Sequence, residues 1–267
     1  MAGGIPEVSP TQHFTSQHFT SKMVVCPDSE ALNLTAAGYL AEVAREAIAA
    51  RGRFAIALAG GSTPKPLYEL LASSPWRTQI DWARVHVFWG DERLVPPDHA
   101  DSNYRMVNTA LLSKVPINAT HVHRVPTELG DPDAVAAAYE KTILQDFNAG
   151  VGEIPRFDVS VLGLGANGHT ASLFPNTSSL AEKQKLVMAE FIQELDQFRV
   201  TMTLPLINHS RNIVFLVSGA GKASVVKEVL SGPNDPRRLP AQLIRPDDGT
   251  LAWMLDKAAA AQLPARS

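Results

Sequence analysis

The chain has 267 residues, of which 45% are hydrophobic and 19% charged, a balance typical of a globular protein with a sizeable core. Its formal net charge of −3 gives no basic excess, so nucleic acid is not an expected partner. The single cysteine, Cys26, excludes an intrachain disulfide and a cysteine-rich zinc site. No apolar run reaches the roughly 18 residues that span a bilayer, and residues 1–22 lack the apolar segment of a secretory signal. We therefore expect a cytoplasmic protein without a membrane partner.

Residues 1–22 are expected to form a flexible tail in front of a single α/β domain at residues 23–267. The tail contains a short tandem repeat, because residues 12–16 and residues 17–21 share the sequence Gln-His-Phe-Thr-Ser. The two histidines of the repeat have no carboxylate or thiol beside them, so no metal site is predicted there.

The first part of the domain is predicted to alternate between buried strands and helices. Apolar runs predict strands at residues 23–26, 54–59 and 84–89. A helix is predicted at residues 28–52, because an Asp-Ser pair can cap its start and a glycine can end it. This alternation is the pattern of a sheet whose strands are connected by helices.

The second of these strands runs directly into Gly60-Gly61-Ser62-Thr63-Pro64. The two glycines free the turn, Ser62 or Thr63 can cap the next helix, and Pro64 suits its first position. Backbone N–H groups at a helix start, together with two hydroxyls, form a ready anion site. We favour a phosphate-binding loop here over a plain strand–helix turn.

Charged residues follow the third strand. Residues 90–93 read Gly-Asp-Glu-Arg, and residues 101–106, Asp-Ser-Asn-Tyr-Arg-Met, open a helix expected to continue to Leu112. Arg93 and Arg105 are candidates for binding a phosphate or carboxylate through two parallel hydrogen bonds. The alternative for each arginine is a surface ion pair of little energetic weight.

The most informative stretch is the apolar run at residues 157–162 and the loop after it. The run predicts a buried strand, and Gly163, Gly165 and Gly168 let the following backbone approach a ligand. His169 follows at the point where the chain leaves the sheet, which is where ligands bind in open α/β folds. An imidazole with an ordinary pKa near ~6.5 suits general-base catalysis at neutral pH. The alternative is that His169 only caps a helix.

The rest of the chain continues the alternation and adds one more candidate. Further strands are predicted at residues 120–125, 186–191, 199–204, 212–217 and 251–255. Further helices are predicted at residues 132–148, 223–230 and 256–263, and a short helix or turn at residues 205–210. Lys222 follows a Gly-rich strand end and offers a point charge for phosphate, or it is a solvated first residue of a helix. A mainly parallel sheet would bring the four polar strand ends to one edge.

Together these loops resemble the 6-phosphogluconolactonase family. The segments that carry the resemblance are residues 59–64, 89–93, 101–106, 163–175, 221–223 and 239–241. The resemblance covers about residues 23–263 and implies a Rossmann-like three-layer α/β fold without a metal or redox cofactor. The activity that it implies is hydrolysis of 6-phospho-D-glucono-1,5-lactone to 6-phospho-D-gluconate in the pentose phosphate pathway. A small sugar phosphate is then the expected partner, and monomer and homodimer both stay open.

The resemblance and the residues together suggest a mechanism. His169 is expected to take a proton from the attacking water, Asn167 to orient the imidazole, and Arg93 to hold the oxyanion. The residues expected to contact the substrate or its phosphate are Gly60, Gly61, Ser62, Thr63, Asp91, Ser102, Asn103, Arg105, Gly168 and Lys222.

Asn167 departs from the family pattern, which has aspartate at this position. A neutral amide can orient the imidazole but does not offset the charge of its protonated form. Two alternatives are weighed against the lactonase. A glucosamine-6-phosphate deaminase would carry a glutamate where this chain has Phe174, and a non-catalytic sugar-phosphate sensor would not need His169.

Overall fold

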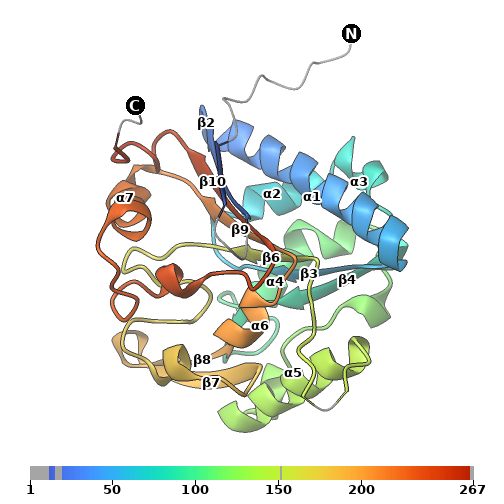
Figure 1. Ribbon diagram of the computed structural model, residues 1–267. Helices are drawn as coiled ribbons and strands as arrows, with labels where there is room; N and C mark the ends of the chain where they lie inside the picture. Colours follow the sequence, from blue (N-terminus) through green and yellow to red (C-terminus); the bar gives the residue numbers. More distant parts are fainter. Residues whose placement is uncertain (1–11, 16–19, 151, 265–267) are drawn as a thin grey trace.

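The computed structural model describes residues 12–15, 20–150 and 152–264, and its centre is a seven-stranded sheet. The strands are β1 (Gln12–Thr15), β2 (Thr20–Cys26), β3 (Phe54–Leu58), β4 (Val85–Trp89), β6 (Val159–Leu162), β9 (Asn212–Val217) and β10 (Thr250–Asp256). Their order across the sheet is β1-β2-β10-β9-β6-β3-β4, and every neighbouring pair is parallel except β1 and β2. The predicted α/β fold with a mainly parallel sheet is confirmed (Figure 1).

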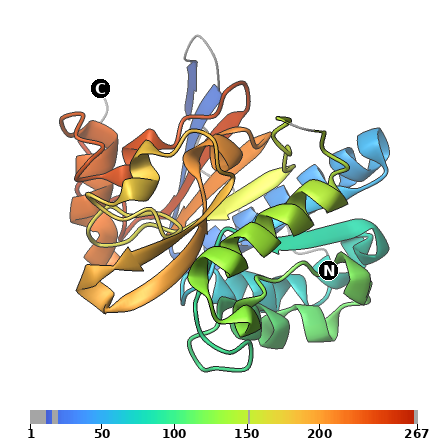
Figure 2. The ribbon, with the colours of Figure 1, turned by 90° about the horizontal axis from the view of Figure 1, so that it is seen from below.

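Other elements cover both faces of this sheet and complete three layers (Figures 1 and 2). The helices are α1 (Ser29–Arg51), α2 (Lys65–Leu71), α3 (Trp76–Gln79), α4 (Asn103–Ala110), α5 (Pro132–Asp146), α6 (Leu204–Asn208) and α7 (Ala223–Ser231). Helix α1 contacts β2, β3 and β10 and lies with α2 and α3 on one face, whereas α5 and α6 lie on the other. Within the described part of the chain, no helix has the length and apolar character of a membrane span.

Helix α1 begins and ends where its sequence signals predict, and α5 begins at a signal of the same kind. The Asp28 side chain caps α1 by accepting a hydrogen bond from the Ala31 amide at 2.9 Å, and Gly52 ends the helix in the left-handed region at φ 74°. The Asp131 side chain caps α5 in the same way, with Pro132 as the first helical residue. Local chemistry therefore sets these boundaries.

A second, three-stranded sheet was not predicted. It consists of β5 (Asp91–Arg93), β8 (Gln197–Met202) and β7 (Val187–Ile192) in the order β5-β8-β7, all antiparallel. Residues 91–93, whose charges follow the third predicted strand, form a short strand themselves. The short turn between β7 and β8 permits only an antiparallel pair, and the Met202 amide bonds to the Gly90 carbonyl at 2.8 Å. This small sheet therefore sits against the end of β4.

Two predicted elements take other conformations. The strand predicted at residues 120–125 is wrong, because the Asn118 side chain caps a 3-10 turn and only Val122 bridges β4. The helix predicted at residues 256–263 is wrong as well. Asp256 belongs to β10, its carboxylate accepts from the amides of Gly219 and Ala259, and residues 257–262 form turns.

Part of the segment predicted as a tail pairs with the sheet. Strand β1 runs antiparallel to β2, with Gln12 opposite Met23 and Thr15 opposite Thr20. Residues 1–11 and 16–19 lie outside the described residues, so a flexible tail there stays a prediction.

The strand order places a topological switch point between β3 and β6. Strand β3 leads to β4 on one side of this point, whereas β6 leads to β9 and then β10 on the other. The connections therefore diverge and leave a crevice at the carboxyl ends of β3 and β6, where ligands bind in open α/β sheets. The two Gly-rich loops of the sequence follow these two strands.

Candidate active site

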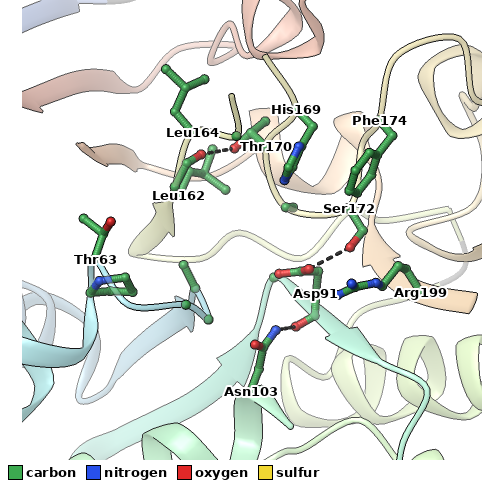
Figure 3. A pocket seen from close by; sticks show the side chains of 18 of the residues that line it. Thr63, Asp91, Asn103, Leu162, Leu164, His169, Thr170, Ser172, Phe174 and Arg199 are labelled. Atoms are coloured by element: carbon green, nitrogen blue, oxygen red, sulfur yellow. Dashed lines mark hydrogen bonds between the residues drawn. The ribbon is translucent and has the colours of Figure 1, made fainter. Parts of the chain in front are cut away.

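A pocket of about 600 Å³ lies at this switch point. Its walls are the loops after β3, β6 and β9 together with residues of β5, β8 and the start of α4. Figure 3 labels side chains from the loops after β3 and β6 and from β5, α4 and β8. The volume lies within the roughly 300–1,000 Å³ that small-molecule sites enclose. The sheet therefore presents one shared cavity to the predicted polar loops.

The loop after β6 holds the His169 ring by tight backbone packing. The Gly165 amide donates to the His169 carbonyl at 2.8 Å, and the Thr170 hydroxyl donates to the Gly163 carbonyl at 2.9 Å. A Cβ at Gly165 would lie 2.1 Å from Nδ1 of His169, so only glycine leaves room for the ring. Phe174 stacks on the imidazole with ring centroids 4.0 Å apart. The ring position is therefore fixed before any ligand binds.

Asn167 sets the tautomer of His169. Its side-chain oxygen lies 2.6 Å from the ring Nδ1 and 3.2 Å from the backbone nitrogen of His169. Its side-chain nitrogen donates to the Glu194 carboxylate at 3.4 Å, which orients the amide so that its oxygen faces the histidine. Nδ1 is then the protonated nitrogen and donates to Asn167, and Nε2 is left as the proton acceptor.

The His169 imidazole is held neutral. Burial lowers its pKa to about 4, and the nearby cations Lys222 and Arg199 lower it as well, whereas the Asp91 carboxylate acts in the opposite direction. A neutral Asn167 adds no charge that would stabilise the imidazolium. The ring is therefore a neutral acceptor throughout the physiological pH range.

Two acidic residues at the start of β5 organise the opposite wall. Asp91 accepts a hydrogen bond from the Ser172 hydroxyl at 2.7 Å, and its backbone carbonyl accepts from the Asn103 side chain at 2.9 Å (Figure 3). Glu92 is buried and accepts from the amides of Asn103 and Tyr104, both at 2.8 Å, at the start of α4. Burial raises the pKa of the Glu92 carboxyl. Glu92 therefore anchors α4, and Asp91 faces the pocket.

Arg93 and Arg199 are direct partners across the antiparallel pair of β5 and β8, and both line the pocket. Like charges placed opposite each other destabilise a sheet. Burial and the Arg93 charge lower the pKa of Arg199. Arg93 donates to the Asp101 carbonyl at 2.6 Å, but among the described residues neither Nε has a hydrogen-bond partner. An anion between the two guanidinium groups would satisfy both donors.

The loop after β3 approaches the pocket closely because it begins with two glycines. A Cβ at Gly60 would lie 1.8 Å from the Asn103 side-chain oxygen, so the backbone and this amide pack directly together. Gly61 has φ +94°, a conformation that favours glycine. Both glycines are thus required by the local geometry.

The hydroxyl residues of this loop are not helix caps. The cap predicted for Ser62 or Thr63 is wrong, because α2 starts only after Pro64 and has no side-chain cap. Pro64 was predicted as the first helical residue, but it directly precedes the first helical residue, Lys65. Ser62 and Thr63 line the pocket, as does Lys222 from the loop after β9, and burial lowers the Lys222 pKa. This cluster combines two hydroxyls with one cation.

Most residues predicted for the site line this pocket. They are Gly60, Gly61, Ser62, Thr63, Asp91, Arg93, Asn103, Asn167, His169 and Lys222. Ser102, Arg105 and Gly168 lie outside its wall. Ser102 is buried as the cap of α4, and Arg105 is exposed two positions after Asn103, which on a helix points it away from that neighbour. The Gly168 backbone packs against Leu239 instead.

Several wall residues were not among those predicted for the site, including Ser172, Phe174, Glu194 and Arg199. Ser172 and Phe174 lie in residues 163–175, which carry the family resemblance, but neither residue was predicted to take part in the site. Arg199 lies in a segment predicted as a strand. Side chains alternate between the two faces of a strand, so Arg199 would have been expected on the face opposite to that of its buried neighbour Val200. Glu194 lies in the β7–β8 turn and gave no local signal.

Comparisons with known proteins agree with this arrangement. Residues 27–253 match the family model of glucosamine-6-phosphate isomerases/6-phosphogluconolactonase. A 6-phosphogluconolactonase of Synechocystis sp. is 45% identical over 218 residues, covering 82% of this chain and 88% of the relative. One of Nostoc sp. is 42% identical over 239 residues, covering 90% and 97%.

Solved structures agree as well. The 6-phosphogluconolactonase from Trypanosoma cruzi superposes with a TM-score of 0.82 at 31% identity, covering 94% of this chain and 100% of the other. A monomeric glucosamine-6-phosphate deaminase shares the fold, with a TM-score of 0.74 at 21% identity. The chain therefore belongs to the glucosamine-6-phosphate isomerase/6-phosphogluconolactonase family.

Proposed function

We propose that this chain hydrolyses 6-phospho-D-glucono-1,5-lactone to 6-phospho-D-gluconate, a step of the pentose phosphate pathway, with His169 as the general base. The observation that carries the proposal is the neutral His169 imidazole, whose Nδ1 lies 2.6 Å from the Asn167 oxygen while Nε2 remains the acceptor. The names of the relatives support the same reaction. The pocket supplies cations for a phosphorylated substrate.

The chemistry needs one base and one oxyanion stabiliser. Nε2 of His169 takes a proton from water while the water oxygen bonds to the lactone carbonyl carbon. Arg93 and loop N–H groups stabilise the oxyanion that forms. Its collapse breaks the bond between that carbon and the ring oxygen, and the imidazolium returns its proton to the ring oxygen. The acid product releases a proton to solvent, and His169 is neutral again.

We propose that the substrate phosphate lies at the other side of the pocket, between the loop after β3 and Lys222. Ser62, Thr63 and Ser218 line one neighbouring hollow, so the loops after β3 and β9 approach each other there. Backbone N–H groups after Gly60 and the Lys222 ammonium together match a phosphate. Arg199 joins Arg93 at the lactone end, and Arg105 has no place in this assignment because it is exposed outside the pocket wall.

The deaminase reading is weaker. Opening and isomerising an amino sugar needs an additional carboxylate base, and the residue at the corresponding position is Phe174, which stacks on His169. A sensor without catalysis would not need a histidine held in a single tautomer. Asp91 does carry a carboxylate into the pocket, but it is bonded to Ser172.

The test is hydrolysis of freshly generated 6-phosphogluconolactone, coupled to oxidation of the product, with the spontaneous rate subtracted. Wild type should turn over, and His169→Ala should lower kcat by ~10²-fold or more. His209→Ala is the matched control, because His209 lies outside the pocket and pairs with Asp247. Turnover of glucosamine 6-phosphate instead of the lactone would overturn the proposal, as would near-native kcat in His169→Ala. A cytoplasmic location and the oligomeric state stay predictions.

A further inference from the structure

Three ligand-type side chains converge at the end of the sheet opposite the pocket. His86 is the second residue of β4, so it lies near the amino end of this strand, whereas the active-site loops lie at the carboxyl ends. His123 follows Val122, which bridges Val87, and its amide donates to the Val87 carbonyl at 2.9 Å. Asp146 is the last residue of α5. Three separate segments thus meet at one point.

We propose that His86, His123 and Asp146 bind one divalent metal ion of the Zn²⁺ class. One Asp146 oxygen lies 2.9 Å from Nδ1 of His86 and 3.0 Å from Nε2 of His123. One ligand atom from each residue lies within 4.8 Å of the other two. Ligands about 2.0–2.2 Å from a tetrahedral Zn²⁺ are separated by about 3.3–3.6 Å, so the Asp146 oxygen needs to move away from each histidine nitrogen by only roughly half an ångström.

The surrounding side chains hold these ligands in place. Arg53 binds the second oxygen of Asp146 and donates to its backbone carbonyl at 2.9 Å, which leaves the first oxygen turned toward the histidines. The His121 ring stacks on His86 with centroids 3.9 Å apart, and Phe88 stacks on His123 at 4.5 Å. Metal ligands are commonly oriented by such outer contacts. Each of the three ligand side chains is less than 15% exposed.

The donor set selects the kind of ion. Two imidazole nitrogens and one carboxylate suit Zn²⁺ and neighbouring late first-row ions, whereas Mg²⁺ and Ca²⁺ prefer oxygen ligands throughout. Arg53 and the His121 ring also face the cluster, and the Arg53 charge offsets that of Asp146. We therefore expect binding weaker than that of a zinc finger. The ion would connect β4, the segment around Val122 and the end of α5.

The experiment is titration of the metal-free, full-length chain with Zn²⁺ by calorimetry, with thermal unfolding measured in parallel. We expect one ion per chain and a rise in Tm on adding Zn²⁺. His123→Asn and Asp146→Asn should each weaken binding by at least about 100-fold and abolish the rise in Tm. His209→Asn, a surface histidine beside Asp247, should leave both unchanged.

Two further measurements keep the result unambiguous. A chain with both tail histidines replaced, His13→Asn and His18→Asn, should bind like wild type, because these residues are not part of the cluster. Lactone hydrolysis by each metal-free variant reports whether it is folded. The proposal is overturned if wild type binds no stoichiometric ion, if binding survives in both His123→Asn and Asp146→Asn, or if it disappears with the tail histidines.

Discussion

The side-chain oxygen of Asn167 lies 2.6 Å from Nδ1 of His169, so a neutral amide occupies the place from which a carboxylate would stabilise the imidazolium. Burial lowers the His169 pKa to about 4, and no negative charge at position 167 compensates. The amide thus supplies orientation without charge. The consequence is a base that is always available at neutral pH but weak.

Asn167→Asp should raise the His169 pKa. The imidazole of the wild type is protonated only as the pH falls through about 4, and kcat/KM should fall with it. An aspartate beside Nδ1 favours the charged form, so the acidic limb should move upward by roughly 1–2 pH units. A more basic imidazole should also raise kcat several-fold at pH 7.5. The pH profile of kcat/KM measures both effects.

Glu194 provides the control for this substitution. It lies 3.4 Å from the Asn167 side-chain nitrogen, so an aspartate at 167 would meet a like charge. The double variant Asn167→Asp, Glu194→Gln removes this repulsion. Its acidic limb should therefore show the effect of an aspartate at position 167 on the His169 pKa without the contribution of the Glu194 charge. An acidic limb that stays in place in both variants would mean that a group other than His169 controls it.

The depressed pKa of His169 also predicts how stability depends on pH. The folded protein holds this ring neutral down to about pH 4, whereas the unfolded chain binds a proton below 6.5. Between these values the unfolded state carries more protons, so stability decreases as the pH falls. From pH 8 to pH 5 the contribution of His169 is about 2 kcal/mol of unfolding free energy. His169→Asn should lose correspondingly less stability over this range in urea unfolding. Equal losses in the two proteins would contradict the assignment.

Two glycines of one loop give a matched pair of substitutions. A Cβ at Gly165 would lie 2.1 Å from two atoms of the His169 ring, so Gly165→Ala must displace the imidazole. A displacement of about 1 Å can cost 10²-fold in rate, and we expect kcat to fall at least tenfold. A Cβ at Gly163 meets nothing within 4 Å among the described residues, so Gly163→Ala should retain near-native kcat. Similar kcat values for the two variants would show that ring position is not limiting.

The sequence predicts those parts of the site that follow from local chemistry. The loops after β3 and β6 are recognisable because glycines and polar residues directly follow apolar strands, and each such pattern spans only a dozen residues. The caps of α1 and α5 are local in the same sense. The parallel sheet then brings these loops together without further information.

The other wall of the pocket depends on contacts between distant segments. Strand β5 has only three residues, all charged, and exists because β8 pairs with it from more than a hundred residues away. Arg199 therefore reaches the pocket through a pairing that no local pattern encodes. The bond between Asp91 and Ser172 joins residues 81 positions apart. Conversely, Arg105 matches a binding motif but lies on the exposed side of α4.

The phosphate site predicted from the sequence includes both Lys222 and Arg105, whereas the site proposed from the structure includes only Lys222 of the two. Lys222 lines the pocket, whereas Arg105 is exposed outside its wall, although both were expected to contact phosphate. Lys222→Met should lower kcat/KM for 6-phosphogluconolactone by roughly 10–100-fold, mainly through KM, because a charge-assisted contact to the phosphate is lost. Arg105→Met removes the same charge and should remain near wild type.

The unphosphorylated substrate, glucono-1,5-lactone, decides whether Lys222 acts on the phosphate. If the Lys222 ammonium contacts only that group, Lys222→Met and wild type should hydrolyse the unphosphorylated lactone with similar kcat/KM, since neither can use the contact. A comparable loss on both lactones would instead place Lys222 at the reacting carbonyl and Arg93 or Arg199 at the phosphate. A raised KM in Arg105→Met would show that α4 turns toward the ligand on binding. Each result assigns a different cation to the phosphate. The two substrates and the two variants together therefore determine the orientation of the lactone in the pocket.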